Sequence, residues 1–234
     1  MGKCTVAGGN PGMKAPVTFK PNFADNTWAA IIKACQTNTV PDTWVVGSQK
    51  PMTIGGTSYP IDIIGKNHDT YVSSGAASLT FQFHDCYTAI KRMNSSDTNS
   101  GGYAASEMHK IHLPEIKTLM PSEVKTAIKS VKKRSGIGGG SSSGTQEVDC
   151  ELFLLSEIEV CGSTLSSFAG EGTQYEYYKA GNSKRKTRNG SSEGWWGRSP
   201  GKGYGNIFAC IDSGGDADFR PASDGHGVAP GFCF

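Results

Sequence analysis

Polar side chains of several chemical types gather near the C-terminal end of the sequence, between short apolar segments. Tyr and Phe offer rigid contact area, while Asn, Asp, Arg and Ser offer adaptable hydrogen-bonding groups, a mixture typical of binding surfaces built from loops. A solvated loop rim without a ligand is the competing interpretation. We predict a ligand-binding surface formed by Lys202, Tyr204, Asn206, Asp212, Asp216, Asp218, Phe219, Arg220, Ser223, Asp224 and His226.

These loops need a rigid support. Trp195 and Trp196 are neighbours on a predicted strand, so one ring is expected to face the core and the other the opposite face. Arg198 is expected to pair with a carboxylate or a carbonyl beneath the loops. Because large aromatic residues mostly serve packing, we predict a structural frame of Trp195, Trp196, Arg198, Phe208 and Phe232.

The sequence contains residues that can bind metal ions, but their spacing matches no known metal site. The four aspartates between positions 212 and 224 are hard oxygen donors of the kind that calcium prefers, yet their spacing is not that of an EF-hand loop. His109 and His112 stand three positions apart on a predicted helix, without a third ligand at a recognisable spacing. The sequence therefore predicts no metal site and no cofactor.

Two His-Asp pairs are the main catalytic candidates. His68-Asp69 and His84-Asp85 each follow a strand-like run, and adjacent strand residues point to opposite faces. Ordinary structural hydrogen bonding is the favoured interpretation. The P-loop and His-Glu-x-x-His motifs are absent from the sequence. We predict no catalytic residues and a protein that is not an enzyme.

Charge and hydropathy limit the classes of partner that the protein is expected to bind. The basic cluster Lys184 to Arg188 suits nucleic acid or a polyanionic glycan, but it has no interleaved aromatic residues, and a solvated loop is favoured. The formal net charge of +2 gives little general attraction to nucleic acid or membranes. No apolar run approaches the roughly 20 residues of a membrane span. We expect no nucleic-acid partner and no membrane insertion.

The cysteines and glycines indicate the class of fold. The seven cysteines form no Cys-x-x-Cys pair, and several lie in apolar runs, so they are interpreted as small buried hydrophobes rather than disulfides. With 31 glycines and only 19% charged residues, the composition argues against a helical bundle. Short strands joined by Gly-rich loops fit it better.

Local patterns predict the elements that must hold the site. Residues 1–22 are rich in Gly and Pro and resemble an extended arm or linker. A helix is expected after Thr27, with Trp28, Ile31, Ile32 and Cys35 on one face. Gly55-Gly56 predicts a hairpin. The expected strands lie at Thr43–Gly47, Tyr59–Ile64 and Leu79–Phe83.

The middle of the chain is expected to be helical. One helix should run from Tyr103 to Met120 with an interruption at Pro114, and Pro121 should open another. The apolar face of that second helix comprises Val124, Ala127, Ile128 and Val131. A Gly/Ser-rich insertion loop is predicted at 135–147, followed by a strand at Cys150–Leu155 that needs a partner from elsewhere. Residues 161–194 are expected to be irregular and functional.

A chain of motifs carries a resemblance to a known family. The motifs are Ile64-Gly65-x-Asn67-His68-Asp69, Gly101-Gly102-Tyr103, Leu152 to Val160, Glu171 to Tyr178, Ala180 to Lys184, Trp195-Trp196-x-Arg198-Ser199-Pro200 and Gly227-Val228-Ala229-x-Gly231-Phe232-Cys233. Across residues 25–234 the sequence resembles a domain family of unknown function that is common in gut Firmicutes and their phages and prophages, often in tail-associated proteins. Its ending is similar to the C-type-lectin-like fold of formylglycine-generating-enzyme relatives and of diversity-generating-retroelement variable proteins.

The resemblance implies an α+β, C-type-lectin-like fold of small antiparallel sheets, flanking helices and long irregular loops, as one domain over 23–234. It implies a non-enzymatic recognition module of a phage or prophage tail-type structure, binding a bacterial cell-surface protein or glycan. It further implies contacts with other virion or tail proteins and assembly of the chain into a homo-trimer. The expected location is a virion or phage-tail particle, after synthesis in the bacterial cytoplasm.

Two alternatives remain open. One is a structural virion or decoration protein whose N-terminal arm docks onto a larger assembly. The other is an enzyme of the formylglycine-generating type, although its copper-binding cysteine pair is not recognisable, and Cys210 and Cys233 lie in apolar settings. The Glu-Pro-Asn and Trp-Asn-Asp motifs of sugar-binding C-type lectins are absent, so the resemblance does not imply calcium-dependent sugar binding.

Overall fold

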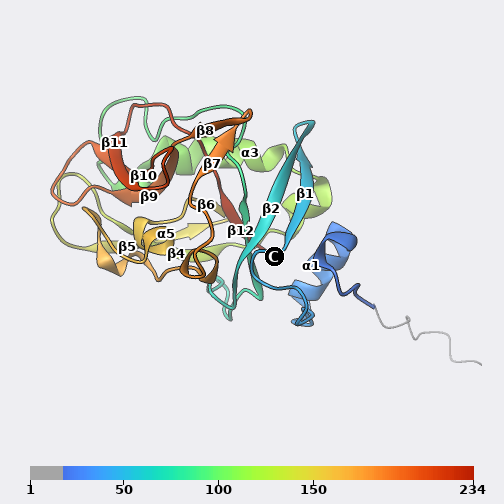
Figure 1. The fold of residues 1–234 in the computed structure, drawn as a ribbon. Coiled ribbons are helices and arrows are strands. Elements are labelled where there is room, and N and C mark those ends of the chain that lie inside the picture. The colour runs from blue at the N-terminus through green and yellow to red at the C-terminus, as the bar shows by residue number, and fades with distance from the viewer. Residues whose placement is uncertain (1–17) are drawn as a thin grey trace, which may run out of the picture.

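A five-stranded antiparallel sheet organises one half of the structure, a computed structural model that describes residues 18–234 (Figure 1). Its strands follow the order β1-β2-β3-β12-β6. They are β1 (Gln49–Ile54), β2 (Thr57–Lys66), β3 (Leu79–Phe83), β6 (Leu152–Phe153) and β12 (Gly231–Cys233). Since β12 lies between β3 and β6, the C-terminal strand is held inside this sheet, near α1 (Trp28–Gln36).

The β1–β2 hairpin forms where the sequence predicts it. Gly55 and Gly56 have φ angles of +57° and +86°, which suit the two central positions of a tight hairpin turn. The strands predicted at 59–64 and 79–83 are confirmed as β2 and β3. The strand predicted at 43–47 is wrong: this segment makes turns, and Gly47 leaves the extended conformation with φ +89°.

The first helix is also confirmed. The Thr27 hydroxyl accepts a hydrogen bond from the Ala30 N–H at 3.1 Å, which satisfies one of the free donors at the start of α1. The short 3₁₀ turn η1 (Phe23–Asp25) precedes it. Residues 1–17 of the predicted arm lie outside the described residues. Phe19, within the arm, packs edge-on against Trp44 with ring centroids 5.7 Å apart.

A three-stranded antiparallel sheet lies on the side of the molecule away from α1 (Figure 1). It contains β9 (Trp195–Pro200), β10 (Ile207–Ile211) and β11 (Ala217–Pro221), in the order β11-β10-β9. Trp195 and Trp196, neighbours on β9, are both fully buried. Each indole N–H donates to a carbonyl, that of Lys184 for Trp195 and of Lys91 for Trp196. Chain segments therefore cover both faces of β9.

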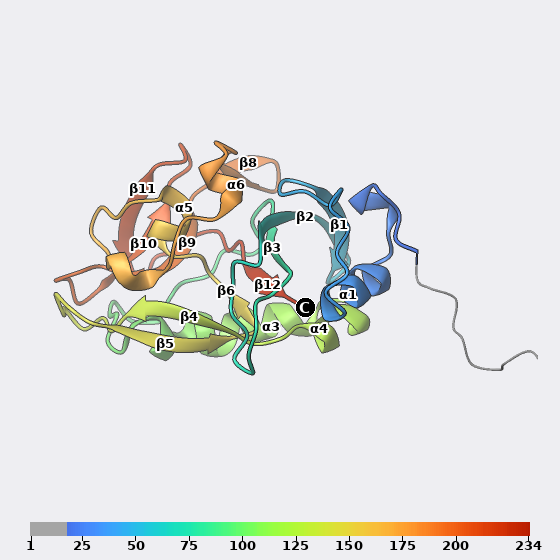
Figure 2. The same ribbon diagram turned by 90° about the horizontal axis from the view of Figure 1, so that it is seen from below.

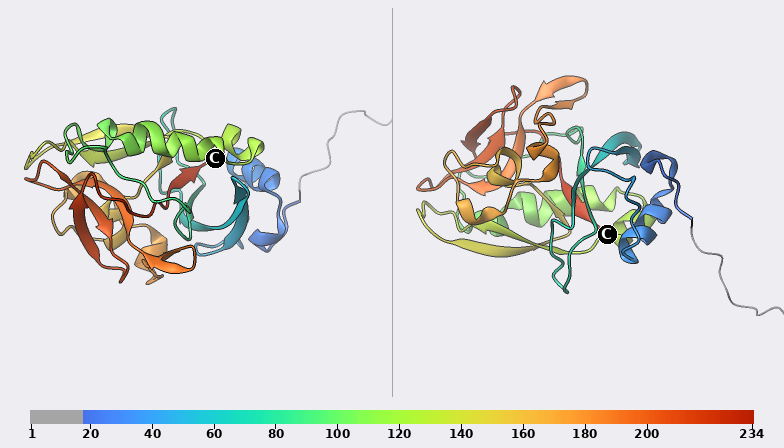
Figure 3. Two further views of the ribbon diagram at one scale, coloured as in Figure 1. Left: turned by 90° about the horizontal axis from the view of Figure 1, so that it is seen from above. Right: turned by 60° about the horizontal axis from the view of Figure 1, so that its bottom comes forward.

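Short helices run along one side of the molecule, as Figure 3 shows in green. They are α2 (Gly102–Ala105), the π-helical turn η2 (Met108–His112), α3 (Leu113–Thr118) and α4 (Ser122–Ala127). The predicted helix over Tyr103–Met120 is interrupted at Ser106, which leaves the helical conformation. Pro114 instead lies in the first turn of α3, where its missing N–H breaks no bond. Among residues 18–234, every helix is too short or too polar to cross a membrane.

A long hairpin lies alongside these helices (Figure 2). Its strands are β4 (Val131–Gly136) and β5 (Thr145–Cys150). The expectation that Val131 extends the helix is wrong, because α4 ends at Ala127. The alternation of buried Val131 and Lys133 with exposed Lys132 and Arg134 is a strand pattern, which the run of positive charge obscured.

The β4–β5 hairpin also changes the interpretation of residues 135–155. The predicted insertion loop at 135–147 is shorter, because β4 continues to Gly136 and β5 begins at Thr145. β5 pairs with β4 directly before it, whereas β6 pairs with the distant β12, which confirms for Leu152–Phe153 the expected partner from elsewhere. The strand predicted at Cys150–Leu155 is divided, since β5 and β6 belong to different sheets.

The stretch 161–194 is more ordered than its composition suggests. Four elements interrupt it, and α5 (Glu157–Cys161) ends where it begins. The four are η3 (Ala169–Glu171), α6 (Glu176–Lys179), β7 (Lys186–Arg188) and β8 (Ser191–Glu193). Tyr175 and Tyr178 are buried, and their hydroxyls bond to Asp69 and Gln82. These tyrosines therefore fill the interior and do not form the functional loop that we expected.

The cysteines among residues 18–234 are all free thiols. Five of them are buried and Cys161 is partly exposed. The interpretation of cysteines as small buried hydrophobes is confirmed for those five residues, whereas Cys4 lies outside the described residues.

An aromatic cluster joins α1 to the five-stranded sheet. Phe81 of β3 packs against Phe23, Trp28, Phe232 and Phe234, with ring centroids between 5.3 and 6.2 Å apart. On the opposite face of the same strand, Thr80 and Gln82 are also buried and make hydrogen bonds. The strand therefore alternates apolar and polar residues, although both of its faces are covered.

Replacing Phe81 with Ala should lower the free energy of unfolding by about 3–5 kcal/mol, because the truncation leaves a cavity at the centre of the cluster. Urea denaturation of purified Phe81→Ala protein measures this change. Tyr204→Ala, which truncates an aromatic side chain that is 54% exposed, is the control and should change stability little. A loss below about 1 kcal/mol for Phe81→Ala would contradict the packing described above.

Candidate functional site

The predicted frame residues are divided between the two sheets: Trp195, Trp196, Arg198 and Phe208 belong to the three-stranded sheet, and Phe232 belongs to β12 of the five-stranded sheet. Trp195, Trp196, Arg198, Phe208 and Phe232 are all fully buried. Arg198 of β9 donates from both terminal nitrogens to Glu159, with Nη2 2.8 Å from Oε1. It also donates to the carbonyls of Arg134, Leu154 and Glu171. The sequence predicted a carboxylate or a carbonyl as partner, and the guanidinium has both.

Glu159 is placed by the start of α5. Ser156 caps this helix: its hydroxyl accepts from the Glu159 N–H at 3.2 Å, and Glu159 Oε2 accepts from the Ser156 N–H at 3.0 Å. This reciprocal capping box holds the carboxylate in a fixed position. The Ser156-x-x-Glu159 pattern is the sequence signal that indicates this residue.

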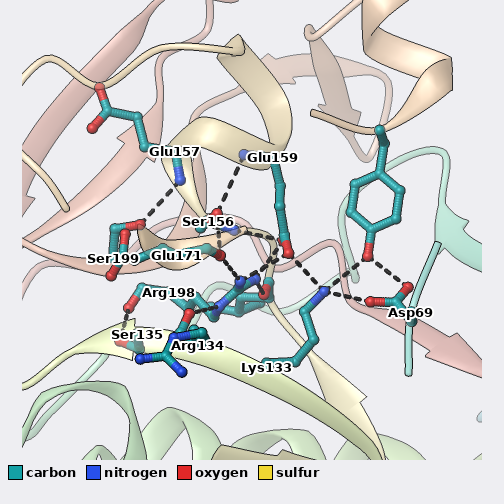
Figure 4. Close-up of polar contacts among 12 residues, drawn as sticks. Asp69, Lys133, Arg134, Ser135, Ser156, Glu157, Glu159, Glu171, Arg198 and Ser199 are labelled. Carbon is teal, nitrogen blue, oxygen red and sulfur yellow. Dashed lines mark hydrogen bonds and ion pairs between the residues drawn. The ribbon is translucent and has the colours of Figure 1, made fainter. Parts of the chain in front are cut away.

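Lys133 extends the network to the five-stranded sheet. Its ammonium lies 2.7 Å from Asp69 Oδ1 and 2.7 Å from Glu159 Oε1. Asp69 also accepts hydrogen bonds from Thr80 and Tyr175. Figure 4 shows Lys133 between Asp69 and Glu159, with Arg198 also bonded to Glu159. Two cations thus meet two carboxylates in the interior.

The protonation states follow from this pairing. Burial alone would raise the pKa of the Asp69 carboxyl, but Lys133 and the surrounding hydrogen bonds hold that pKa below its ordinary value. Burial opposes the charge of Glu159 too, yet Arg198 and Lys133 lower its pKa. The pKa of Lys133 is raised, because Asp69 and Glu159 outweigh the cost of its burial. All three groups are therefore charged at neutral pH.

Glu171 differs from its neighbours. Burial raises the pKa of its carboxyl to about 7. Oε1 accepts from the Gly136 N–H at 2.6 Å, whereas Oε2 is buried without a hydrogen-bond partner among the described residues. An unpaired carboxylate oxygen in this position disfavours ionisation, so the carboxyl is largely protonated below neutral pH.

Four of the predicted ligand residues come together in one surface hollow. Asp212, Asp218, Arg220 and His226 line a depression of about 290 Å³ beside β10 and β11, together with Ser192, Glu193, Gly194, Cys210 and Ser213. Asp218 and Arg220 are half-exposed and form an ion pair at 2.6 Å. An adjacent cation and carboxylate offer both donors and acceptors to a polar ligand. Glu193 and Ser192 were not predicted, and no local pattern distinguishes them.

The other predicted residues lie elsewhere. Phe219 pairs with Ala209, whereas Asp218 pairs with Cys210, so Phe219 points to the opposite face of β11. The loop with Lys202, Tyr204 and Asn206 joins β9 to β10 at the end of the sheet away from Asp212. Its backbone bonds to Ser141 and Ser166. The eleven residues therefore do not form one continuous surface.

The Asp212 side chain stabilises the turn in which it lies. Oδ1 accepts from the N–H groups of Gly214 and Asp216 at 2.8 and 2.9 Å, as turn-forming aspartates do. Asp216 and Asp224 are exposed, and Ser223 lines a second hollow nearby. Within residues 18–234, no group of three or more His, Cys, Asp or Glu side chains is arranged to hold a metal ion.

The His-Asp pairs make structural contacts. His84 Nδ1 lies 2.7 Å from Asp62, while Asp85 accepts from the N–H and hydroxyl of Thr187. His68 stacks on Tyr175 with ring centroids 3.9 Å apart, while Asp69 faces Lys133. The two members of each pair therefore have separate partners.

The basic cluster at 184–188 is not a solvated loop throughout. Lys186 is buried, and its ammonium donates to the carbonyls of Phe83 and His84 and lies 5.2 Å from the centre of the Trp195 ring. Arg188 pairs with Glu193 at 2.7 Å. The expectation of a solvated loop is therefore wrong for Lys186, because carbonyl oxygens in the interior take the place of water.

Replacing Lys133 with Met should lower the free energy of unfolding by about 3–5 kcal/mol, because Asp69 and Glu159 then share a single buried cation. Chemical denaturation measures the loss. In the double variant Lys133→Met with Asp69→Asn, the buried charges balance again, and we expect it to recover at least half of the lost stability. A double variant less stable than Lys133→Met would contradict charge balance as the cause.

Glu171→Gln should change how stability depends on pH. The folded pKa of about 7 lies above the ordinary value of 4.5, so the wild type loses stability as the pH rises from about 4.5 to about 7. Gln does not ionise. Relative to the wild type, the variant should therefore gain about 3 kcal/mol in unfolding free energy between pH 5 and pH 8. Equal pH profiles for the two proteins would show that Glu171 ionises normally.

Comparison with known proteins gives one match. A sequence model of the domain of unknown function DUF6273 matches residues 78–234, which is more than half of the chain and includes β3 and all later elements. No curated protein and no solved structure matches the chain. The matched segment contains both the frame and the surface hollow. The chain therefore belongs to the DUF6273 family.

Proposed function

We propose that the protein is a non-enzymatic recognition module of a phage or prophage tail-type structure, which binds a bacterial surface protein or glycan through its C-terminal loops. The observation that carries this proposal is the hollow beside β10 and β11. There the half-exposed Asp218–Arg220 pair, Glu193 and His226 lie over fully buried Trp196 and Phe208. Polar groups on a rigid support are the usual basis of recognition by loops.

A C-type-lectin-like fold is part of the proposal. Three features support it: the C-terminal strand β12 inside the five-stranded sheet, a separate small sheet that begins with Trp195-Trp196, and loops that project from that small sheet. In such an arrangement the last strand closes the fold beside the first helix. Trp28 of α1 and Phe234 lie with their ring centroids 6.2 Å apart.

The positions of the cysteines support a non-enzymatic role. Cys210 lies on β10, whereas Cys233 lies on β12 of the other sheet, with its sulfur 3.6 Å from the Thr80 hydroxyl. A copper-binding pair needs two thiolates side by side. Burial raises the pKa of the Cys210 thiol to about 12 and raises that of Cys233 as well. Neither thiol is therefore a ready nucleophile or metal ligand at neutral pH.

The assembly is the part of the proposal that rests most on the sequence resemblance. As a tail-associated module, the protein would act on a virion or phage-tail particle, in contact with other tail proteins and as a trimer. Several copies side by side raise the effective strength of weak individual sites. A shallow polar hollow of the observed size is compatible with this mode of binding.

The proposal is tested by binding of purified, fluorescently labelled protein to a panel of gut Firmicutes strains. We expect strain-selective binding. Asp218→Ala with Arg220→Ala should weaken it about tenfold or more, because charge-assisted hydrogen bonds contribute about 1.5–3 kcal/mol each. The matched control is Lys202→Ala with Tyr204→Ala, two exposed changes at the other end of the sheet, which should leave binding unchanged.

The outcomes separate the alternatives. Loss of binding only in the control variant would place the receptor site on the loop between β9 and β10. Equal binding by the wild type and both double variants would show that neither surface binds the receptor. Absence of binding to every strain would favour a structural virion or decoration protein, which electron microscopy of purified particles would then localise.

A further inference from the structure

A second hollow lies next to the proposed binding site and has a different chemical character. It measures about 370 Å³ and is lined by Ile90, Lys91, Arg92, His112, Ser223 and Gly225. Three of these residues are basic side chains and one is a hydroxyl. The first hollow, by contrast, is lined by three acids and two basic residues.

The two hollows share one wall. Lys91 and His226 exchange both backbone hydrogen bonds at 3.0 Å as an isolated antiparallel bridge. Lys91 lines the second hollow, and His226 lines the first. The Lys91 carbonyl also accepts from the Trp196 indole at 2.8 Å. The bridge is therefore fixed to the buried frame, and one extended ligand can contact both hollows across it.

The charges of the second hollow are incompletely neutralised. Lys91 and His112 share one carboxylate, that of Glu115, at 3.2 and 3.5 Å. Arg92 is exposed and has no ion pair among residues 18–234. Glu107 is a further acid nearby, and its carboxylate accepts a hydrogen bond from Ser95. Asp224, an exposed acid, stands between the lining residues Ser223 and Gly225. Nε2 of His112 is buried without a hydrogen-bond partner within the described part of the chain.

We propose that this hollow is a phosphate subsite and that the surface ligand is a polymer of hydroxylated units joined by phosphodiesters. This inference rests on the proposed function, because it names the class of ligand. The guanidinium of Arg92, the ammonium of Lys91 and the Ser223 hydroxyl line this hollow, and cationic and hydroxyl donors of this kind bind the oxygens of a phosphate. The neighbouring hydroxylated unit occupies the first hollow, where Asp218 and Arg220 bond to hydroxyl groups.

The test measures binding of purified protein by isothermal titration calorimetry. The probes are a glycerol-phosphate oligomer, inorganic phosphate, a hexuronic acid oligomer and a neutral N-acetylglucosamine oligomer. We expect the glycerol-phosphate oligomer to bind most tightly and inorganic phosphate to compete with it. Raising the salt concentration should weaken binding, because the contacts are ionic.

Three variants separate a phosphate site from general positive charge. Arg92→Gln should weaken binding of the glycerol-phosphate oligomer about tenfold or more, since it removes a charge-assisted contact. Glu115→Gln frees Lys91 and His112 from their shared acid and should strengthen binding several-fold. The matched control is Lys110→Gln, which removes an exposed charge from η2 outside the hollow and should have no effect.

Several results would overturn the inference. Tighter binding of the hexuronic acid or neutral oligomer would exclude phosphate as the recognised group. Equal losses in Arg92→Gln and Lys110→Gln, or equally tight binding of a DNA duplex, would indicate unspecific attraction to polyanions. If cells bind strain-selectively while Arg92→Gln binds them like the wild type, the phosphate subsite fails but the proposed function stands. If no strain is bound although the oligomer is, the recognition role fails and the subsite stands.

Discussion

The ion pair between Arg198 and Glu159 is the interaction on which the rest of the structure depends. The guanidinium comes from β9, its carboxylate from α5, and its other acceptors from β4, the segment after β6, and η3. Buried ion pairs contribute less net stability than their Coulomb energy suggests, because both charges lose their hydration. Their geometric demand is strict, however. Five separate segments must meet within hydrogen-bonding distance, and this requirement fixes how the small sheet sits against the hairpin.

The surface chemistry depends on that fixed interior. Arg198 and Trp196 lie on the same strand, and Trp196 is linked through the Lys91 carbonyl to the wall between the two hollows. The exposed residues of β11 are held by pairing with β10, which pairs in turn with β9. A side chain on β11 can therefore be replaced without disturbing the buried ion-pair network, because no residue of β11 belongs to that network. The buried network and the proposed binding residues of β11 therefore lie on different strands of one sheet.

The sequence predicted features that depend on neighbouring residues and missed those that depend on distant ones. The turn at Gly55-Gly56, the cap at Thr27 and the strand at 79–83 follow from local conformational preference and periodicity. The burial of Lys133 could not be predicted, because its partner Asp69 is 64 positions away and no acid nearby in the sequence indicates the pair. The same reason explains the predicted ligand set. Proximity along the chain grouped Asp218 with Phe219, whereas the pleat of β11 separates them.

The placement of β12 has a consequence for how the protein is made. Residues 231–233 form an interior strand, flanked by β3 and β6, and the Tyr71 hydroxyl donates to the Phe234 carbonyl. During synthesis these residues follow the other four strands of the sheet, so the five-stranded sheet stays open until they emerge. Contacts between such distant parts of a chain form slowly. During synthesis, β3 and β6 therefore present unpaired edges that attract other chains, and a nascent chain stalled before residue 231 is a candidate for aggregation and proteolysis.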